Sequence, residues 1–415
     1  MIITYRNKLS PNFLIVGIFQ LTLISHGIFV WASGLFFIFL FVQVEKEPIK
    51  KRALFESIVF LILLVFSIIR FGFFLSGKIL PYFVSAFWGN LSLYILCILA
   101  WLVLRSIEIG KFRNSLKNVY APILKIHVAI FYFQFIVYLF FAHYIDFLEP
   151  FTGQQSRYNA NFAVIQGIHV VRCTGLFVEP STYSGVVLFL VSLLLICNGF
   201  KKNRRLLVFA IISIFLSFST AAVIIASLFV VYILISERYS LKAYIYIIIS
   251  TLLLAFFAGG KIIDFYNAQD SRYNQASGLR YRFIEVVLNR NNDEALFAKG
   301  AFALENKLAL STTGDNGNKS IASLNDSGLL FFLWAKFGFL GIFYFVILCL
   351  WQLKSSRKNL VFFLFVSSTK VTIFCPLFVL YFSFTAFKDI NLLDVYSRLR
   401  QTQESSKEKN KLEVL

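Results

Sequence analysis

Long apolar runs follow one another along the chain and are separated by short clusters of basic residues. The runs are continuous rather than alternating, which predicts helices and excludes the alternating strands of a membrane barrel. Because a helix needs about 20 apolar residues to cross the hydrocarbon core, these runs are long enough to be spans. The predicted spans of this kind are 53–70, 82–104, 121–142, 182–199, 243–259 and 328–350. Since backbone polar groups in lipid must be satisfied internally, the pattern predicts an all-α polytopic membrane protein.

The basic clusters predict the topology, because Lys and Arg gather in the short cytoplasmic segments of membrane proteins. If every cluster is cytoplasmic, each interval between clusters holds an even number of spans. Three intervals hold about 30 residues each, which would form roughly 45 Å of helix: 12–44, 206–236 and 359–388. Each is too long for one ordinary span and too short for two spans of ordinary length. Parity favours two short helices in each, with turns near His26-Gly27, Ser217–Thr220 and Thr369-Lys370. A single tilted helix in any of them is the alternative.

The count that follows is about twelve transmembrane helices with both termini cytoplasmic. Two segments then face outward and are too long for simple turns, at 143–181 and 260–327. Loops of that length in a compact protein are usually functional or disordered. They carry arginines that the positive-inside rule disfavours in short external loops, namely Arg172, Arg272, Arg280, Arg282 and Arg290. Long loops translocate regardless of charge, and an anionic ligand is the other explanation, because the guanidinium fork matches phosphate oxygens.

The composition excludes several other classes of protein. Hydrophobic residues make up 58% of the 415 residues and charged residues only 15%, too little polar surface for a soluble domain. A net charge of +19 would suggest nucleic-acid binding in a soluble protein, but the positive-inside pattern accounts for it here. Of five cysteines, only Cys173 lies in a predicted aqueous loop, so no disulfide framework is expected. Closely spaced cysteine or histidine pairs are missing from the sequence, so we expect no metal and no cofactor.

The termini add little to the functional interpretation. The basic stretch Met1–Ser10 precedes a long apolar run without a small-residue cleavage site, so no cleaved leader is expected. Residues 1–411 are predicted to form a single integral membrane domain whose tail, 389–411, is cytoplasmic. The last four residues, 412–415, resemble the start of a common engineered protease site and are left out of the interpretation.

Glu179-Pro180-Ser181 predicts the start of a membrane helix. Proline suits the first helical position, and an acid beside it suits the helix dipole. The simplest interpretation is that Glu179 caps this helix and does nothing more. The same geometry, with Arg172 just upstream, also suits a phosphate at the helix N-terminus and a carboxylate that acts as a general base.

Residues 172–181 read R-C-T-G-L-F-V-E-P-S and resemble the R-x-x-G-L-F-x-E-P-S signature of bacterial polysaccharide repeat-unit polymerases. These are the Wzy-type O-antigen polymerases, which are related to the O-antigen ligases. Leu324–Leu330 with Lys336–Gly341 resembles the end of that family's large external loop, followed by a helix that begins in a G-x-L-G-like turn. The segment 277–282, which reads S-G-L-R-Y-R, is a third match within the loop. Through the predicted topology, the resemblance extends over most of the chain.

The resemblance implies a GT-C-like fold and a reaction on the periplasmic face of the bacterial inner membrane. Such enzymes transfer a growing glycan from undecaprenyl diphosphate to the distal sugar of a new undecaprenyl-diphosphate-linked oligosaccharide, without an obvious need for metal. A leaving diphosphate develops negative charge that fixed cations stabilise, and Arg172, Arg280 and Arg282 are the candidates. The acceptor hydroxyl needs a base, for which Glu179 is the first candidate and Asp326 the second.

Other polar residues of the two external segments are candidates for substrate binding: His169, Ser181, Tyr183, Arg290 and Asn325. A lone histidine such as His169 is more often a solvated or hydrogen-bonded residue than a catalyst. The expected partners are the lipid-linked oligosaccharide and membrane lipids, with a polysaccharide chain-length regulator as a further candidate. Nucleic acid is not an expected partner.

Residues 279–288 predict a short amphipathic helix at the membrane interface. Leu279, Phe283 and the pair Val286-Val287 fall at helical spacing, with the charged residues elsewhere on the turn. Arg280 and Arg282 are two apart and do not share one helix face, so only one of them is expected to point into a site. An ordinary surface helix with snorkelling arginines is the alternative.

Three other functions compete with polymerisation. An O-antigen ligase shares the fold, but ligases typically carry a histidine near the end of the large external loop, and 260–327 contains none. A lipid-linked oligosaccharide flippase or other transporter would suit about twelve spans, but transporters usually have internal repeats and charged spans near the midplane. A membrane acyltransferase would usually present histidine motifs, which the sequence does not have.

Overall fold

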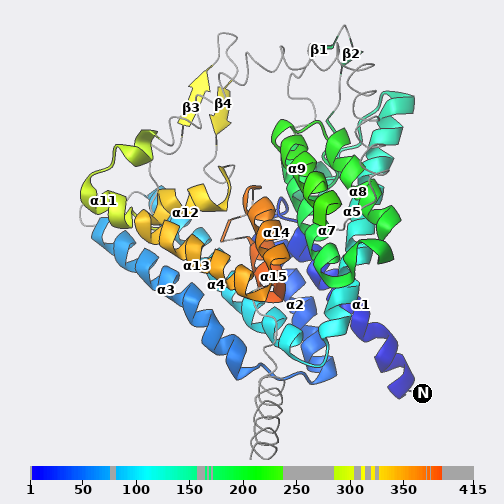
Figure 1. Cartoon of the computed structure of the whole chain (residues 1–415), viewed down its shortest axis with the longest axis horizontal. Helices are drawn as coiled ribbons and strands as arrows, with labels where there is room; N and C mark the ends of the chain where they lie inside the picture. Colours follow the sequence, from blue (N-terminus) through cyan, green and yellow to red (C-terminus); the bar gives the residue numbers. More distant parts are fainter. Residues whose placement is uncertain are drawn as a thin grey trace, which may run out of the picture.

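The computed structural model is built mainly of helices in the residues that it describes (Figure 1). Those residues are 2–74, 81–156, 164–165, 168–169, 172–236, 285–302, 310–313, 319–322, 327–370, 372–373 and 375–385. The first half begins with long helices: α1 (Ile2–Thr22), α2 (Ile28–Glu45), α3 (Lys51–Phe74), α4 (Pro81–Ile109) and α5 (Arg113–Phe141).

Short elements lie between α5 and the helices of the second half. In the first predicted external loop they are α6 (Glu149–Thr152), β1 (Val164–Ile165) and β2 (Ile168–His169). The next helices are α7 (Pro180–Lys202), α8 (Arg204–Leu216) and α9 (Thr220–Ser236). The second predicted external loop contributes α11 (Asn292–Phe297), β3 (Leu310–Thr313) and β4 (Lys319–Ala322). The chain then forms α12 (Leu329–Phe337), α13 (Phe339–Ser355), α14 (Arg357–Ser367) and α15 (Pro376–Thr385).

The architecture is that of an α-helical membrane protein. In the part of the chain that the structure describes, five helices are long and apolar enough to cross a membrane: Ile28–Glu45, Lys51–Arg70, Phe87–Ile109, Arg113–Phe141 and Pro180–Lys202. Large apolar side chains such as Phe55, Phe133 and Phe343 lie exposed on the outside of the helices. Such side chains are stable against the lipid of a bilayer. In water they would form a large exposed apolar surface.

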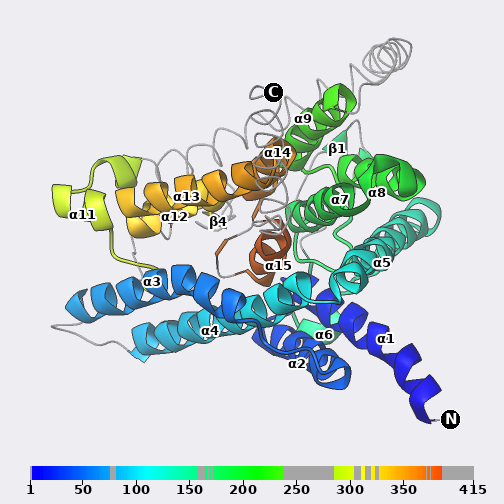
Figure 2. The same ribbon diagram turned by 60° about the horizontal axis from the view of Figure 1, so that its bottom comes forward.

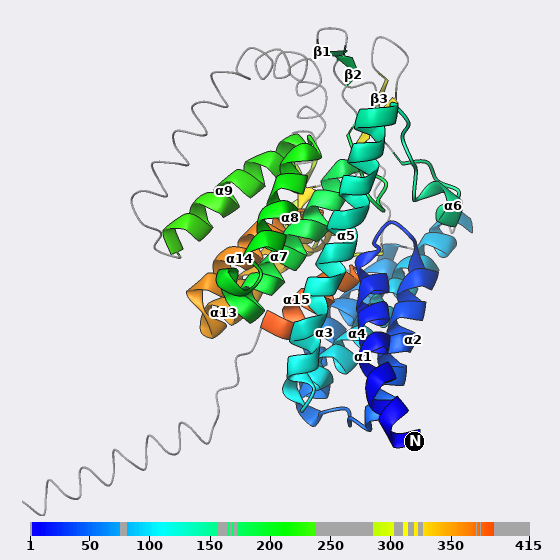
Figure 3. The ribbon, with the colours of Figure 1, turned by 90° about the vertical axis from the view of Figure 1, so that its right-hand side faces the viewer.

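Helix α7 is surrounded by other helices (Figures 2 and 3). It packs against α5, α8, α9, α14 and α15. In the most apolar 18-residue stretch of α7, 72% of the residues are buried inside the protein. The corresponding share is at most 44% in the other four candidate spans. The residues at the start of α7 are therefore held from several sides.

The three stretches of intermediate length break where the sequence predicts. The α1–α2 turn follows Thr22 and includes Gly27, whose φ of +85° favours glycine. The α8–α9 turn lies between Leu216 and Thr220, and the α14–α15 turn lies between Ser367 and Pro376. The predicted helix pairs are confirmed in these three places, while the total of about twelve spans stays a prediction.

The single span predicted at 328–350 is wrong, because the chain breaks at Gly338 into α12 and α13. Gly338 has φ +63° and ψ −143°, a conformation that interrupts a helix and favours glycine. A Cβ at Gly341 would overlap the carbonyl oxygen of Leu333, so α13 folds back tightly along α12. The predicted start of a helix in the G-x-L-G-like turn is correct, since α13 begins at Phe339.

The all-α prediction misses two antiparallel hairpins in the predicted external loops. Strand β1 pairs with β2, and β3 pairs with β4 with Leu310 opposite Ala322. Strands are tolerated there because only backbone inside the hydrocarbon must be helical or in a closed barrel. Short helices are also present in both loops, as α6 and α11, at positions other than the one predicted. Of the amphipathic helix predicted at 279–288, the described part, 285–288, is helical with Val287 buried and Glu285 exposed.

Buried charges tie together the ends of four helices near the basic clusters. Arg105 of α4 donates from Nε to Glu56 of α3 at 2.7 Å and pairs with Glu108. It also donates from Nη1 to the carbonyl oxygen of Ser383 in α15 at 3.0 Å. Glu108 pairs in addition with Arg113 at the start of α5 at 3.1 Å. Buried charges are stable only when they are paired, so this cluster fixes the C-terminal end of α15.

A second polar anchor holds part of the predicted large external loop against α3. Arg70 donates from Nε and Nη2 to the carbonyl oxygen of Ala298, at 3.0 and 2.7 Å. The amide of Ala301 donates to Ser67 at 3.3 Å, and the amide of Gly300 donates to the carbonyl oxygen of Lys336 at 2.9 Å. The segment that follows α11 is therefore attached both to α3 and to the end of α12.

Candidate functional site

The carboxylate of Glu179 is not used as a helix cap. Glu179 occupies the N-cap position of α7 with extended backbone angles, φ −135° and ψ 148°, and its side chain makes no cap hydrogen bond. Its main-chain oxygen accepts from the amides of Thr182 and Tyr183 at 3.1 Å each, and Pro180 occupies the first turn. The simple capping role is therefore performed by the backbone, and the carboxylate is directed to other groups.

Those groups are a lysine and a serine. Lys370 donates from Nζ to Glu179 Oε2 in an ion pair, and Ser181 donates from Oγ to the same oxygen at 3.2 Å. The side chains of Glu179 and Lys370 are 20% and 19% exposed, so both are partly accessible. The two candidate residues Glu179 and Ser181 are therefore in direct contact in the structure.

Lys370 was not among the residues predicted for the site. It lies in the turn between α14 and α15, 191 positions after Glu179, and the sequence indicates only that a turn is present there. A lone charge inside an apolar stretch was the available signal, because ionisable residues in membrane segments are rare and usually functional.

Gln134 of α5 holds the loop that carries the G-L-F part of the signature. Its Oε1 accepts from the amides of Thr174 and Gly175 at 3.1 and 2.9 Å, and its Nε2 donates to the carbonyl oxygen of Ile145 at 2.7 Å. Gly175 has φ +59°, and a Cβ there would lie 3.0 Å from the ring of Tyr183. The glycine and the glutamine together determine the path of the chain toward Glu179.

Tyr183 is a packing residue in this structure. It is fully buried, its ring stacks on Phe131 with centroids 4.5 Å apart, and its hydroxyl donates to Ser213 Oγ at 2.7 Å. This arrangement does not fit the direct substrate contact that its assignment as a binding residue requires. Its ring instead packs against the turn at Gly175.

The end of the predicted large external loop lies beside the turn that bears Lys370. A Cβ at Gly328 would lie 2.9 Å from the carbonyl oxygen of Ser367 and 3.5 Å from Ser368, at the beginning of the turn that bears Lys370. The second motif, Leu324–Leu330, therefore ends beside the turn that meets the first motif. The candidate residues Asn325 and Asp326 directly precede this point but lie outside the described residues.

The predicted arginines and His169 are described only in part. Arg172 is half-buried and begins the described part of the segment that Gln134 holds. Arg290 is half-buried and directly precedes α11, which lies far from α7 in two views (Figures 1 and 2). His169 is in β2 and nothing is described of its side chain, and Arg280 and Arg282 lie outside the described residues.

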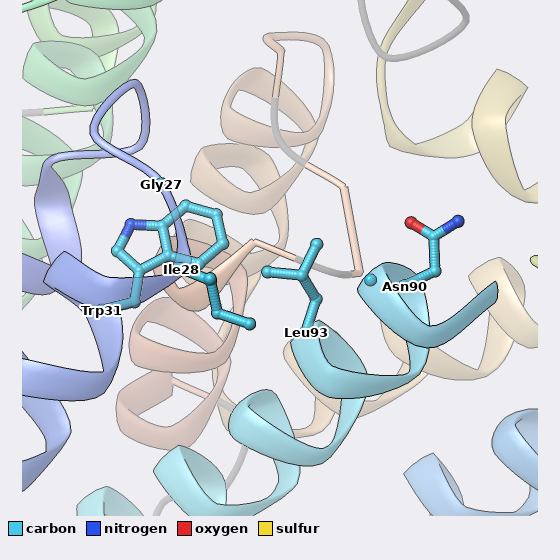
Figure 4. Close-up of a pocket in the computed structure, with 6 residues that line it drawn as sticks. Gly27, Ile28, Trp31, Asn90 and Leu93 are labelled. Carbon is cyan, nitrogen blue, oxygen red and sulfur yellow. The ribbon is translucent and has the colours of Figure 1, made fainter. Parts of the chain in front are cut away.

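An apolar cavity of about 360 Å³, which is largely open to the outside, lies between α2 and α4 (Figure 4). It is lined by Gly27, Ile28, Trp31, Gly89, Asn90 and Leu93. The α1–α2 turn at its edge touches the first motif, because Ser25 Oγ accepts from the amide of Val178 at 3.3 Å. In the same turn, burial lowers the pKa of His26 below its ordinary value, which keeps the ring neutral near pH 7. An apolar space thus lies close to the Glu179–Lys370 pair.

Comparisons with known proteins returned no relative: no protein family, no curated protein and no solved structure matches this chain.

Proposed function

We propose that this protein polymerises oligosaccharide repeat units that are linked to undecaprenyl diphosphate, on the periplasmic face of a bacterial inner membrane. The single observation that carries the proposal is the state of Glu179. Within a stretch that resembles the polymerase signature, its carboxylate is not used as a cap and lies partly exposed against a lysine and a serine. A partly exposed carboxylate that does not cap its helix can be reached by an acceptor hydroxyl.

The proposed reaction transfers the growing glycan to the distal sugar of a new lipid-linked unit. The bond between the anomeric carbon and the diphosphate oxygen breaks, and a bond from that carbon to the acceptor hydroxyl oxygen forms. Glu179 takes the proton of the hydroxyl, and the diphosphate leaves with the electron pair. Arg172, with Arg280 and Arg282 from the large loop, stabilises the charge that develops on the diphosphate. Asp326 is the second candidate for the base.

Two further features of the structure support this assignment. Gln134 and Gly175 hold the signature loop rigidly, as a catalytic group requires, and the end of the large loop returns to the turn of Lys370. The cavity between α2 and α4 begins at a turn that touches Val178, so a prenyl chain lying there would have its polar end near Glu179. A GT-C-like arrangement of about twelve spans, with cytoplasmic termini, belongs to the same proposal.

A gene deletion separates this proposal from its competitors. Loss of a polymerase leaves surface glycan with a single repeat unit on a gel. Loss of a ligase removes the surface-linked glycan altogether, and loss of a flippase accumulates repeat units on the cytoplasmic face. A normal ladder of chain lengths in the deletion strain would contradict the proposal.

Complementation with point variants then tests the residue. Glu179→Gln should give only the single-unit product at normal expression, because an amide cannot accept the proton. Glu149→Gln is the matched control: Glu149 is another acid of the same external segment, exposed and hydrogen-bonded to Gln155 at 3.1 Å. It should restore the wild-type ladder. Wild-type chain lengths with Glu179→Gln would remove this carboxylate from the mechanism.

A further inference from the structure

Glu179 cannot serve as a free base while it is bound to Lys370. The ammonium group of Lys370 and the hydroxyl of Ser181 both donate to Oε2 of Glu179, so they occupy an oxygen at which the carboxylate would accept a proton. Catalysis by Glu179 therefore requires that the ammonium group move away or be shared with another anion before the acceptor hydroxyl is deprotonated.

We propose that Lys370 is an exchangeable cation of the site. Without substrate it holds Glu179, and when a lipid-linked diphosphate binds, its ammonium group moves to the diphosphate and releases the carboxylate. The inference rests on the proposed function, since it concerns the binding of the donor or acceptor lipid at the same site. It assigns a diphosphate-binding role to a residue outside the three recognisable motifs.

Thr369, which directly precedes Lys370, is held by contacts of its own, whereas the side chain of Lys370 is partly exposed. Thr369 packs on Gly185 of α7, where a Cβ would lie 3.3 Å from the threonine Cβ, and its hydroxyl donates to the carbonyl oxygen of Val366 at 2.6 Å. Lysine carries a compact charge with three donors on a flexible four-carbon stem, so the head group can change partner without movement of the backbone. Glu179 also accepts a hydrogen bond from Ser181.

The pair also differs from the structural ion pairs of the same protein. In the cluster of Arg105 with Glu56 and Glu108, the side chains are between 1% and 7% exposed. The side chains of Glu179 and Lys370 are 20% and 19% exposed. An accessible pair changes an equilibrium by a factor of only roughly 1.5 to 5, so a diphosphate, with more negative charge, competes with it effectively.

Binding of farnesyl diphosphate to the purified full-length protein in detergent tests the exchange, for example by titration calorimetry at pH 7.5. Lys370→Met should weaken binding at least about 10-fold, the usual effect of losing a charge-assisted contact. Glu179→Gln should tighten binding roughly 1.5- to 5-fold, because the ammonium group is no longer held by a carboxylate. Lys299→Met is the matched control, a lysine paired with Glu294 at 3.5 Å in the external segment beyond α11, and should bind as wild type.

The Glu179→Gln arm decides the result even if Lys370→Met does not fold. Unchanged or weaker binding by Glu179→Gln would overturn the exchange, as would unchanged binding by a folded Lys370→Met variant. Inorganic pyrophosphate is the second probe, and equal affinity for it would overturn the assignment to a lipid-linked diphosphate. These outcomes are independent of the deletion experiment: a normal glycan ladder after deletion would refute polymerisation and leave the measured binding in place.

Discussion

Gln134→Leu is the sharpest test of how the signature loop is held. The leucine is similar in size and suits an apolar helix, but it removes three hydrogen bonds, from the amides of Thr174 and Gly175 and to the carbonyl oxygen of Ile145. At about 0.5–1.5 kcal/mol for each bond, the native position of the loop loses about 1.5–4.5 kcal/mol. The equilibrium constant between the correctly placed loop and a displaced loop should therefore fall at least about 10-fold.

Two measurements check this expectation: the ladder of glycan lengths in cells, and thermal unfolding of the purified protein in detergent. Gln134→Leu should shorten the glycan chains and lower the unfolding temperature. Gln352→Leu is the control, since Gln352 is equally buried and its amide makes no hydrogen bond within the part of the chain that the structure describes. It should leave both measurements unchanged or raise the unfolding temperature. Wild-type chain lengths with Gln134→Leu would refute the role given to this glutamine.

Three further predictions follow from the same contacts. Gly175→Ala should cost about 1–2 kcal/mol of stability and shorten the glycan, because φ at this position is +59° and the ring of Tyr183 would crowd the added Cβ. Gly153→Ala is the control, since Gly153 has φ +67° with open space around it, and it should lower the unfolding temperature but keep the glycan ladder. Arg105→Met should cost about 3–5 kcal/mol, seen as loss of folded protein by size-exclusion chromatography, since two buried carboxylates lose their shared cation; a wild-type yield would contradict it. Burial raises the pKa of Cys173 to about 12, so its thiol stays protonated and maleimide labelling, followed by mass spectrometry, should be slow from pH 7 to 9 and fast after denaturation; fast labelling of the native protein would contradict its burial.

The helical pairs could be predicted because they follow from length alone. A stretch of about 30 apolar residues is too long for one ordinary span, and polar or flexible residues near its middle, such as His26-Gly27 and Thr369-Lys370, favour a turn there. The break at Gly338 could not be found in this way. Its conformation depends on α11, whose residues Ala295 and Leu296 lie so close that a Cβ at Gly338 would overlap them. This contact is with another element, so the length of the apolar run does not reveal the break, and only the G-x-L-G-like turn indicated a helix start there.

The candidate site was predictable only where its residues are neighbours in sequence. Glu179 and Ser181 belong to one motif, and the start of α7 follows from proline beside an acid. Lys370 meets Glu179 across 191 positions, and Gln134 meets Gly175 from another helix, so neither contact can be read from spacing. Both residues did leave a signal, because a polar side chain inside an apolar run is costly unless it has a partner.

Reconstitution measures the central claim most directly. The purified protein in detergent or lipid vesicles is incubated with undecaprenyl-diphosphate-linked repeat units from the same cells, and the products are separated by chain length. The account predicts a ladder of lipid-linked polymer with the release of undecaprenyl diphosphate, and neither product with Glu179→Gln. Absence of polymer with a folded wild-type protein, or a full ladder with Glu179→Gln, would contradict it.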